Sequence, residues 1–163
     1  MKIIQIVGFK NSGKTTLATT LIKMLTEQGY RVASLKHHGH GGMPIGIMNT
    51  DSEKHRQAGA IFSGVEGDGL FQLSAASWNM EQMLSVYQLL QIDVLVMEGF
   101  KKEPYPKIAL IKRKEEMALL EQAENIIAIV SSLSFSDSAA CPVFDVNNID
   151  ELFEWLHSEL LHD

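Results

Sequence analysis

The chain has 163 residues, of which 45% are apolar and 21% are charged, and these proportions exclude a disordered or fibrous protein. This length suits one ordinary domain, so we expect a single domain over residues 1–163. Lys and Arg number 14 against 20 Asp and Glu, and the resulting net charge of −6 argues against a nucleic-acid-binding protein. Any anionic ligand must therefore be held by local geometry rather than by bulk charge.

Neither secretion nor membrane insertion is indicated. The single cysteine, Cys141, cannot form an internal disulfide. The apolar run over residues 1–8 is too short for the core of a signal peptide, and no apolar run approaches the roughly 20 residues of a membrane span. We therefore expect a soluble, cytoplasmic protein without a membrane partner.

The first expected elements are two strands with a helix between them. Residues 2–7 and 31–36 are short β-rich runs, and apolar residues at helical spacing predict a helix over 14–28. Gly29 follows that helix, where a left-handed residue is favoured. This order is typical of the start of an α/β domain.

A long loop is expected next, over residues 37–50. Four of the 12 glycines fall there and no periodicity survives, which is typical of a functional loop. Asp51 is then expected to cap a short helix that continues to Ala58.

The middle of the chain predicts a hairpin and a helix. Residues 60–65 and 70–75 flank the turn-forming sequence Glu66-Gly67-Asp68-Gly69. Asn79 with Gln82 three residues later resembles a capping box. The helix that follows would have one apolar face, made by Met80, Met83, Leu84, Tyr87 and Leu90.

The second half returns to strand–helix alternation. Residues 93–97 are continuously apolar, as in a parallel strand buried on both faces. Further strands are expected at 107–111 and 126–130, with a helix near 115–122 and a last helix that starts at Asn148. Together these elements predict an α/β fold with a mostly parallel sheet and an antiparallel hairpin insertion.

The strongest motif is Gly8-Phe9-Lys10-Asn11-Ser12-Gly13-Lys14-Thr15, which matches G-x-x-x-x-G-K-[ST] between an expected strand and an expected helix. Backbone N–H groups from Gly8 to Thr15, Ser12 included, can surround a diphosphate at the positive end of the helix. Lys14 would reach the β- and γ-phosphates, and the Thr15 hydroxyl would bind Mg²⁺. The motif predicts a three-layer P-loop NTPase domain.

Two carboxylates are candidates for the metal. Glu98 follows the buried strand 93–97 directly, at the sheet edge where ligands bind in open α/β folds. Asp51, after the long loop, is the second candidate, in addition to its expected role as a helix cap.

Histidines and lysines surround these motifs. The sequence Lys36-His37-His38-Gly39-His40 leaves two interpretations open, a transition-metal site or polar contacts to anions. In the second interpretation Lys36 and His37 face phosphate or a second ligand. Lys101, with Lys102 and Lys107, forms an expected basic patch on a loop stiffened by prolines.

Several segments resemble the MobB family, the molybdopterin-guanine dinucleotide biosynthesis adapter proteins. Five segments carry the resemblance. They are the P-loop up to Thr16; Lys36-His37-His38; Asp51-Ser52 followed by His55-Arg56-Gln57-Ala58-Gly59-Ala60; Met97-Glu98-Gly99-Phe100-Lys101; and Pro106-Lys107-Ile108.

The resemblance implies a GTP-binding homodimer with at most a weak intrinsic GTPase activity, which assists a MobA-type guanylyltransferase that joins molybdopterin to GMP. It implies GTP and Mg²⁺ as cofactors. Carried over by position, the phosphate-binding residues would be Gly8, Asn11, Gly13, Lys14, Thr15 and Thr16, and the Mg²⁺ residues would be Thr15, Asp51 and Glu98. No Asn-Lys-x-Asp motif is present, so the residues themselves leave guanine and adenine both open.

Two functions other than an adapter are also compatible with these residues. One is a P-loop small-molecule kinase or ligase of the dethiobiotin synthetase type, since Glu98-Gly99 after the expected metal strand also suits that group. The other is a nickel metallochaperone GTPase, which the histidines of residues 37–40 suggest because histidine is a common nickel ligand.

Overall fold

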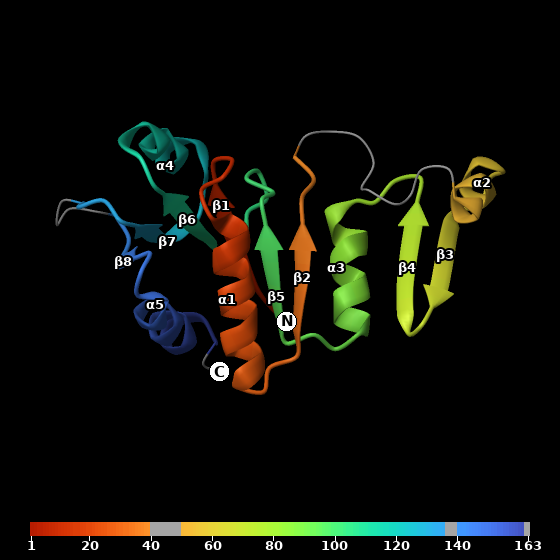
Figure 1. The fold of residues 1–163 in the computed structure, drawn as a ribbon, viewed down its shortest axis with the longest axis horizontal. Coiled ribbons are helices and arrows are strands. Elements are labelled where there is room, and N and C mark those ends of the chain that lie inside the picture. Colours follow the sequence, from red (N-terminus) through yellow and green to blue (C-terminus); the bar gives the residue numbers. More distant parts are fainter. Residues whose placement is uncertain (40–49, 136–139, 162–163) are drawn as a thin grey trace. The chain divides into compact units, whose positions relative to one another are not determined.

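The computed structural model describes residues 1–39, 50–135 and 140–161 and contains a six-stranded parallel sheet. The strand order is β2-β5-β1-β6-β7-β8, and a separate two-stranded sheet pairs β3 with β4 (Figure 1). The strands are β1 (Lys2–Gly8), β2 (Val32–Lys36), β3 (Phe62–Gly67), β4 (Leu70–Ala75), β5 (Val94–Glu98), β6 (Lys107–Ile111), β7 (Ile126–Ser131) and β8 (Val143–Asp145). The helical elements are α1 (Lys14–Glu27), α2 (Asp51–Gln57), α3 (Met80–Leu89), the 3₁₀ segment η1 (Lys114–Ala118), α4 (Leu119–Gln122), α5 (Ile149–Leu156) and the π-helical segment η2 (His157–Leu161).

The chain divides into two compact units. One consists of residues 1–37 and 87–163 and holds the six-stranded sheet; the other consists of residues 38–86 and holds the β3–β4 hairpin. The single domain expected over 1–163 stays a prediction.

Both faces of the six-stranded sheet are packed with apolar side chains. On one face α1 and α5 contribute Leu17, Leu21 and Leu152 to the larger core cluster. On the other face Leu119 of α4 packs with residues of β1, β6 and β7 in a second cluster. β5 is buried from Val94 to Met97, as its uninterrupted apolar sequence predicts for a parallel strand between two others. The sheet and its two coverings form the three layers of an α/β fold.

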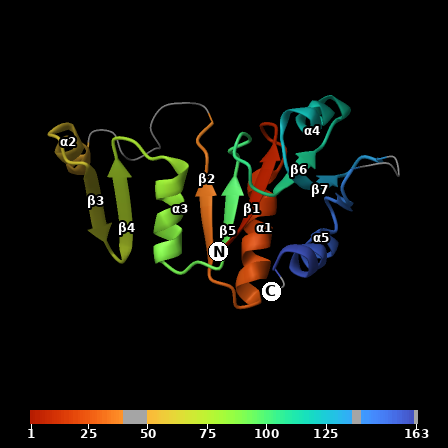
Figure 2. The same cartoon turned by 180° about the vertical axis from the view of Figure 1, so that it is seen from behind.

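Parallel pairing brings the carboxyl ends of neighbouring strands to one edge. β5 pairs in parallel with β1 and with β2, and β1 pairs in parallel with β6. Figure 2 shows the arrowheads of β1, β2, β5 and β6 pointing to the same side. The loops after these strands carry the candidate site.

The second unit contains the predicted hairpin. Gly67 pairs with Leu70, and between them Asp68 and Gly69 have φ of 50° and 78°. Two left-handed residues are the geometry of the two-residue hairpin turn that Asp-Gly favours. Several large apolar side chains of this unit are exposed: Ile61, Phe62, Val65, Leu70, Phe71 and Leu73.

Among the predicted helix starts, one was confirmed in atomic detail and one needs correction. Asn79 and Gln82 form the expected capping box, with Gln82 N donating to Asn79 Oδ1 at 2.8 Å and Asn79 N donating to Gln82 Oε1 at 3.1 Å. The cap of α2 is not Asp51. Thr50 lies at the N-cap and its hydroxyl accepts a hydrogen bond from Glu53 N at 3.2 Å, so Asp51 is the first helical residue.

Other expectations were only partly right. The apolar face predicted for α3 has no fully buried residue, and Leu90 lies beyond the helix and is 54% exposed. The helix near 115–122 is a 3₁₀ turn followed by one α-turn, and the short strand β8 was not expected. Most of the predicted loop, residues 40–49, lies outside the described residues. Among the helices that the structure describes, none has the length and apolar character needed to cross a membrane.

Candidate functional site

The P-loop forms a closed turn between β1 and α1. Asn11 has a left-handed φ of 61°, and Ser12 N donates to Phe9 O at 3.2 Å. A Cβ on Gly8 would lie 2.6 Å from Ser12 Oγ, so only glycine permits this close approach. The sequence motif thus folds into a loop whose backbone turns back on itself.

The N-terminus of α1 is open to an anion. Gly13 is the N-cap, with φ of 98°, and it has no side chain to accept from the first-turn N–H groups. The first turn of α1, all of which is described, carries no acidic residue. The N–H groups and the positive end of the helix dipole can therefore act on a bound phosphate.

Lys14 is the half-buried cation of this loop. Its ammonium donates to the carbonyl oxygen of Phe9 at 2.6 Å, which bends the side chain back over the turn. Burial lowers the pKa of Lys14, Glu98 raises it, and the nearby charges of Lys101 and Lys36 lower it further. An anion at this place would relieve the excess of positive charge.

Thr15, Glu98 and Lys36 meet beside the P-loop. Thr15 Oγ1 lies 3.0 Å from both carboxylate oxygens of Glu98. Lys36 Nζ lies 3.0 Å from Glu98 Oε1 and 3.1 Å from Thr15 Oγ1. The Thr15 hydroxyl and the Glu98 carboxylate thus lie side by side, and the Lys36 ammonium contacts both of them.

The turn after Glu98 is held from two sides. Gly99 has φ of 91°, and a Cβ there would lie 3.1 Å from His37 Cβ, so glycine is required. The ring of His37 also packs on Phe100, with centroids 5.0 Å apart. From beneath, the buried side chain of Gln5 donates to the carbonyl oxygens of Gly99 and Phe100.

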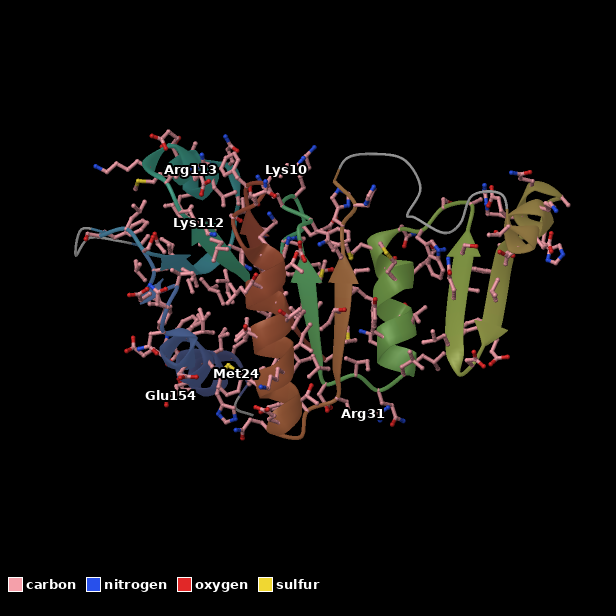
Figure 3. All side chains as sticks on the ribbon, viewed as in Figure 1. Lys10, Met24, Arg31, Lys112, Arg113 and Glu154 are labelled. Carbon is pink, nitrogen blue, oxygen red and sulfur yellow. The ribbon has the colours of Figure 1, made fainter. Side chains whose placement is uncertain are left out.

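Two further lysines lie at the P-loop. Lys101 Nζ is 4.5 Å from the centroid of the Phe9 ring, a cation–π contact that joins the loop after β5 to the P-loop. Lys112, just after β6, places its Nζ 3.5 Å from where a Cβ on Gly13 would lie. Figure 3 shows Lys10, Lys112 and Arg113 at this edge, whereas Met24 and Arg31 lie at the opposite end of the sheet.

The donor set fits Mg²⁺. A threonine hydroxyl and a carboxylate are hard oxygen ligands, of the kind that Mg²⁺ takes together with substrate phosphates and water. Thr15 and Glu98 supply these two oxygens within 3.0 Å of each other. Among the described residues, no group of three or more His, Cys, Asp or Glu side chains is placed so that it could hold a metal ion. His40 of the predicted cluster lies outside them.

Comparison with known proteins identifies the family. Residues 3–132 match the family model described as MobB, molybdopterin guanine dinucleotide synthesis protein B. The chain belongs to the MobB family. The resemblance noted in the sequence is thereby confirmed.

MobB relatives match along most of the chain. A Bacillus subtilis (strain 168) protein named a probable molybdopterin-guanine dinucleotide biosynthesis adapter protein is 41% identical over 150 residues, which cover 90% of this chain and 86% of that protein. The crystal structure of Bacillus subtilis MobB superposes with a TM-score of 0.79 at 36% identity, covering 98% of both chains. The MobB homologue from Bacillus stearothermophilus gives a TM-score of 0.76 at 34% identity, covering 98% and 97%.

Most of the predicted site residues of this MobB-family chain lie in the first unit. The P-loop residues, Lys36, His37, Glu98 and Lys101 are brought to one edge of the six-stranded sheet. Asp51 belongs to the other unit, where its exposed carboxylate accepts from Lys54 Nζ at 2.8 Å. Its metal role stays a prediction.

One lysine of the predicted basic patch is misplaced. Lys107 is fully buried, and its ammonium donates to the backbone carbonyl oxygens of Glu103 and Tyr105. It therefore anchors the loop before β6 and offers no charge to the surface. Burial lowers its pKa.

Two residues at the site were not predicted. Gln5 is a lone polar residue in the apolar run of β1, and this was a signal that its amide serves a buried contact. Lys112 could not be recognised, because its place beside Gly13 depends on the pairing of β6 with β1.

Proposed function

We propose that this chain is a GTP-binding adapter in molybdopterin-guanine dinucleotide synthesis that assists a MobA-type guanylyltransferase acting on molybdopterin. Membership of the MobB family supports the pathway and favours the adapter over the kinase and nickel-chaperone alternatives. The observation that carries nucleotide binding is the contact of Thr15 with Glu98 beside an uncapped helix N-terminus.

The phosphates are assigned to the P-loop. The backbone N–H groups of residues 8–16 would surround the β-phosphate, among them those of Asn11, Ser12 and Gly13. The ammonium of Lys14, which contacts the Phe9 carbonyl oxygen, would move from it to the β- and γ-phosphates. Lys101 and His37 lie at the same edge, where they would meet phosphate or a second ligand.

Mg²⁺ is assigned to Thr15 and Glu98, and Asp51 is kept as a third candidate oxygen donor on its position after the long loop and on the family resemblance. When bound, the ion would supply positive charge that neutralises the phosphates. The sequence marks no glutamine or arginine for orienting an attacking water, so we expect intrinsic GTP hydrolysis to be slow and the protein to act chiefly by binding.

A homodimer is proposed from the second unit. Leu70 and Phe71 of β4 are 78% and 68% exposed, and Phe62 and Val65 of β3 are about half exposed. Exposed apolar side chains gathered on one hairpin are typical of a protein interface. A second copy of the chain is the partner that the family resemblance implies.

Calorimetric titration with GTP, ATP and GDP, each with and without Mg²⁺, tests this function. We expect GTP to bind more tightly than ATP, and Mg²⁺ to strengthen GTP binding. A parallel assay would follow guanylyl transfer to molybdopterin by a MobA-type enzyme, which the chain should stimulate. Equal affinities for GTP and ATP would contradict the guanine assignment, and many turnovers of GTP per second without a partner would contradict the adapter.

A further inference from the structure

Lys36 stands where a metal ion would be expected. Its ammonium lies 3.0 Å from Glu98 Oε1 and 3.1 Å from Thr15 Oγ1, the two groups assigned to Mg²⁺. Lys36 is the last residue of β2 and is the register partner of Glu98 on β5. The contact therefore follows from the pairing of the two strands.

We propose that Lys36 is an exchangeable internal cation: it holds Thr15 and Glu98 together in the nucleotide-free chain and moves to the terminal phosphate of a nucleoside triphosphate when Mg²⁺ takes its place. This inference rests on the proposed function, because it assumes that Mg²⁺ and a triphosphate occupy the P-loop site. It adds a role for Lys36 in distinguishing triphosphate from diphosphate.

The three groups differ in their freedom to move. The Glu98 side chain is only 12% exposed, and its backbone carbonyl accepts from His37 N at 2.9 Å. The Lys36 side chain is 59% exposed and ends a flexible four-carbon stem. When a divalent cation binds to the carboxylate, repulsion between the two positive charges displaces the ammonium, while the carboxylate stays.

When a nucleotide is bound, its terminal phosphate offers the displaced ammonium an anion close by. Lys36 and Lys101 each lie near enough to Lys14 to lower its pKa, so positive charge gathers at the P-loop. Glu98 is the carboxylate that Lys36 pairs with in the described structure. A terminal phosphate beside Mg²⁺ would supply the second negative group, and Lys36 would then donate to it.

The exchange predicts two opposite effects of removing the ammonium. Without Lys36, a divalent cation no longer competes with an internal charge, so the nucleotide-free chain should bind it more tightly. The triphosphate loses a charge-assisted hydrogen bond, whereas the diphosphate, which lacks the terminal phosphate, loses nothing comparable. A lysine that merely stabilised the fold would not produce this pair of effects.

The test compares Lys36→Met with Lys23→Met, a control on α1 that removes an exposed lysine paired with Glu27. Mn²⁺ binding to the nucleotide-free chain is measured by electron paramagnetic resonance, and GTP and GDP binding in saturating Mg²⁺ by calorimetry. For Lys36→Met we expect about tenfold tighter Mn²⁺ binding and about tenfold weaker GTP binding, with GDP binding not weakened. Lys23→Met should behave as the wild type.

The outcomes separate this inference from the proposed function. Equal weakening of GTP and GDP by Lys36→Met, or unchanged Mn²⁺ binding, would overturn the exchange while the proposed function stands. A wild-type chain that binds neither nucleotide would contradict the proposed function and the inference with it. Circular dichroism of each variant verifies that the fold is retained.

Discussion

Thr15 Oγ1 lies 3.0 Å from each carboxylate oxygen of Glu98, although 83 positions separate the two residues in the chain. The contact exists because β5, which ends at Glu98, lies beside β1, which leads into the P-loop. It joins the two sequence motifs into one potential metal and phosphate site. Its consequences can be tested residue by residue.

Substitution of Lys14 by alanine should abolish tight nucleotide binding. The ammonium is assigned to two phosphates, and the loss of two charge-assisted hydrogen bonds of roughly 1.5 kcal/mol each corresponds to a loss of affinity of about a hundredfold or more. Calorimetric titration with GTP in Mg²⁺ measures the change. Lys23→Ala, at an exposed position of α1, is the control, and an affinity for Lys14→Ala equal to that of the control would refute the phosphate assignment.

Glu98→Gln should weaken Mg²⁺-dependent binding selectively. The amide keeps the shape of the side chain but lacks the negative charge that holds the ion. We expect the GTP affinity measured in Mg²⁺ to fall about tenfold, and the affinity in a chelator to change little or to rise. Equal losses in both conditions would remove Glu98 from the metal site.

Nucleotide binding should take up protons at alkaline pH. Burial and two neighbouring lysines lower the pKa of Lys14 below 10.5 in the free chain. A fraction of the Lys14 side chains is therefore deprotonated as the pH approaches this lowered pKa. A bound phosphate favours the charged form and raises the pKa, so binding between the two pKa values draws protons from the solvent. Calorimetry in two buffers of different ionisation enthalpy measures this uptake. Binding without proton uptake at alkaline pH would contradict the placement of Lys14 on phosphate.

Gln5→Leu should loosen the turn that carries Glu98. The substitution leaves the carbonyl oxygens of Gly99 and Phe100 without their buried donor, and should lower the free energy of unfolding by roughly 1–3 kcal/mol. Urea unfolding measures the change against Gln88→Leu, a control on the exposed part of α3. If Gln5 positions Glu98, the Mg²⁺ dependence of GTP binding weakens as well. Lost stability with unaltered Mg²⁺ dependence would assign Gln5 to the fold alone.

Phe71→Glu should shift a dimer toward the monomer. Phe71 is 68% exposed, and its ring lies across Gly64 of the neighbouring strand, where a Cβ would approach within 2.9 Å of the ring. A charge placed on a buried apolar interface is strongly unfavourable. Light scattering after size-exclusion chromatography gives the mass, with Met117→Glu on η1 as the control. A dimer that persists in Phe71→Glu would place the interface elsewhere.

The most accurate predictions from the sequence concern local features, which depend on residues that are consecutive in the chain. The P-loop, the Asp68-Gly69 turn and the Asn79–Gln82 capping box each require only a few consecutive positions, and the structure contains all three. The apolar run before Glu98 likewise identified a strand buried between two parallel neighbours. Local dihedral preferences and burial are sufficient for such features.

What could not be predicted depends on the order of strands in the sheet. The meeting of Lys36 with Glu98 requires β2 to pair with β5, and the position of Lys112 requires β6 to pair with β1. The cap of α2 was assigned one residue too late, since Thr50 and Asp51 are both good caps and the sequence alone does not show which of them accepts the hydrogen bond from Glu53 N. β8 has only three residues, too few for a recognisable period.

Crystallography with a slowly hydrolysed GTP analogue and Mn²⁺ tests the central claim most directly. The anomalous signal of manganese locates the ion independently of the model of the protein. We predict one peak bound by Thr15 Oγ1 and a Glu98 carboxylate oxygen, with the phosphates enclosed by residues 8–16 and Lys14 Nζ on the β- and γ-phosphates. A manganese peak away from Glu98, or a nucleotide bound outside the P-loop, would contradict the account.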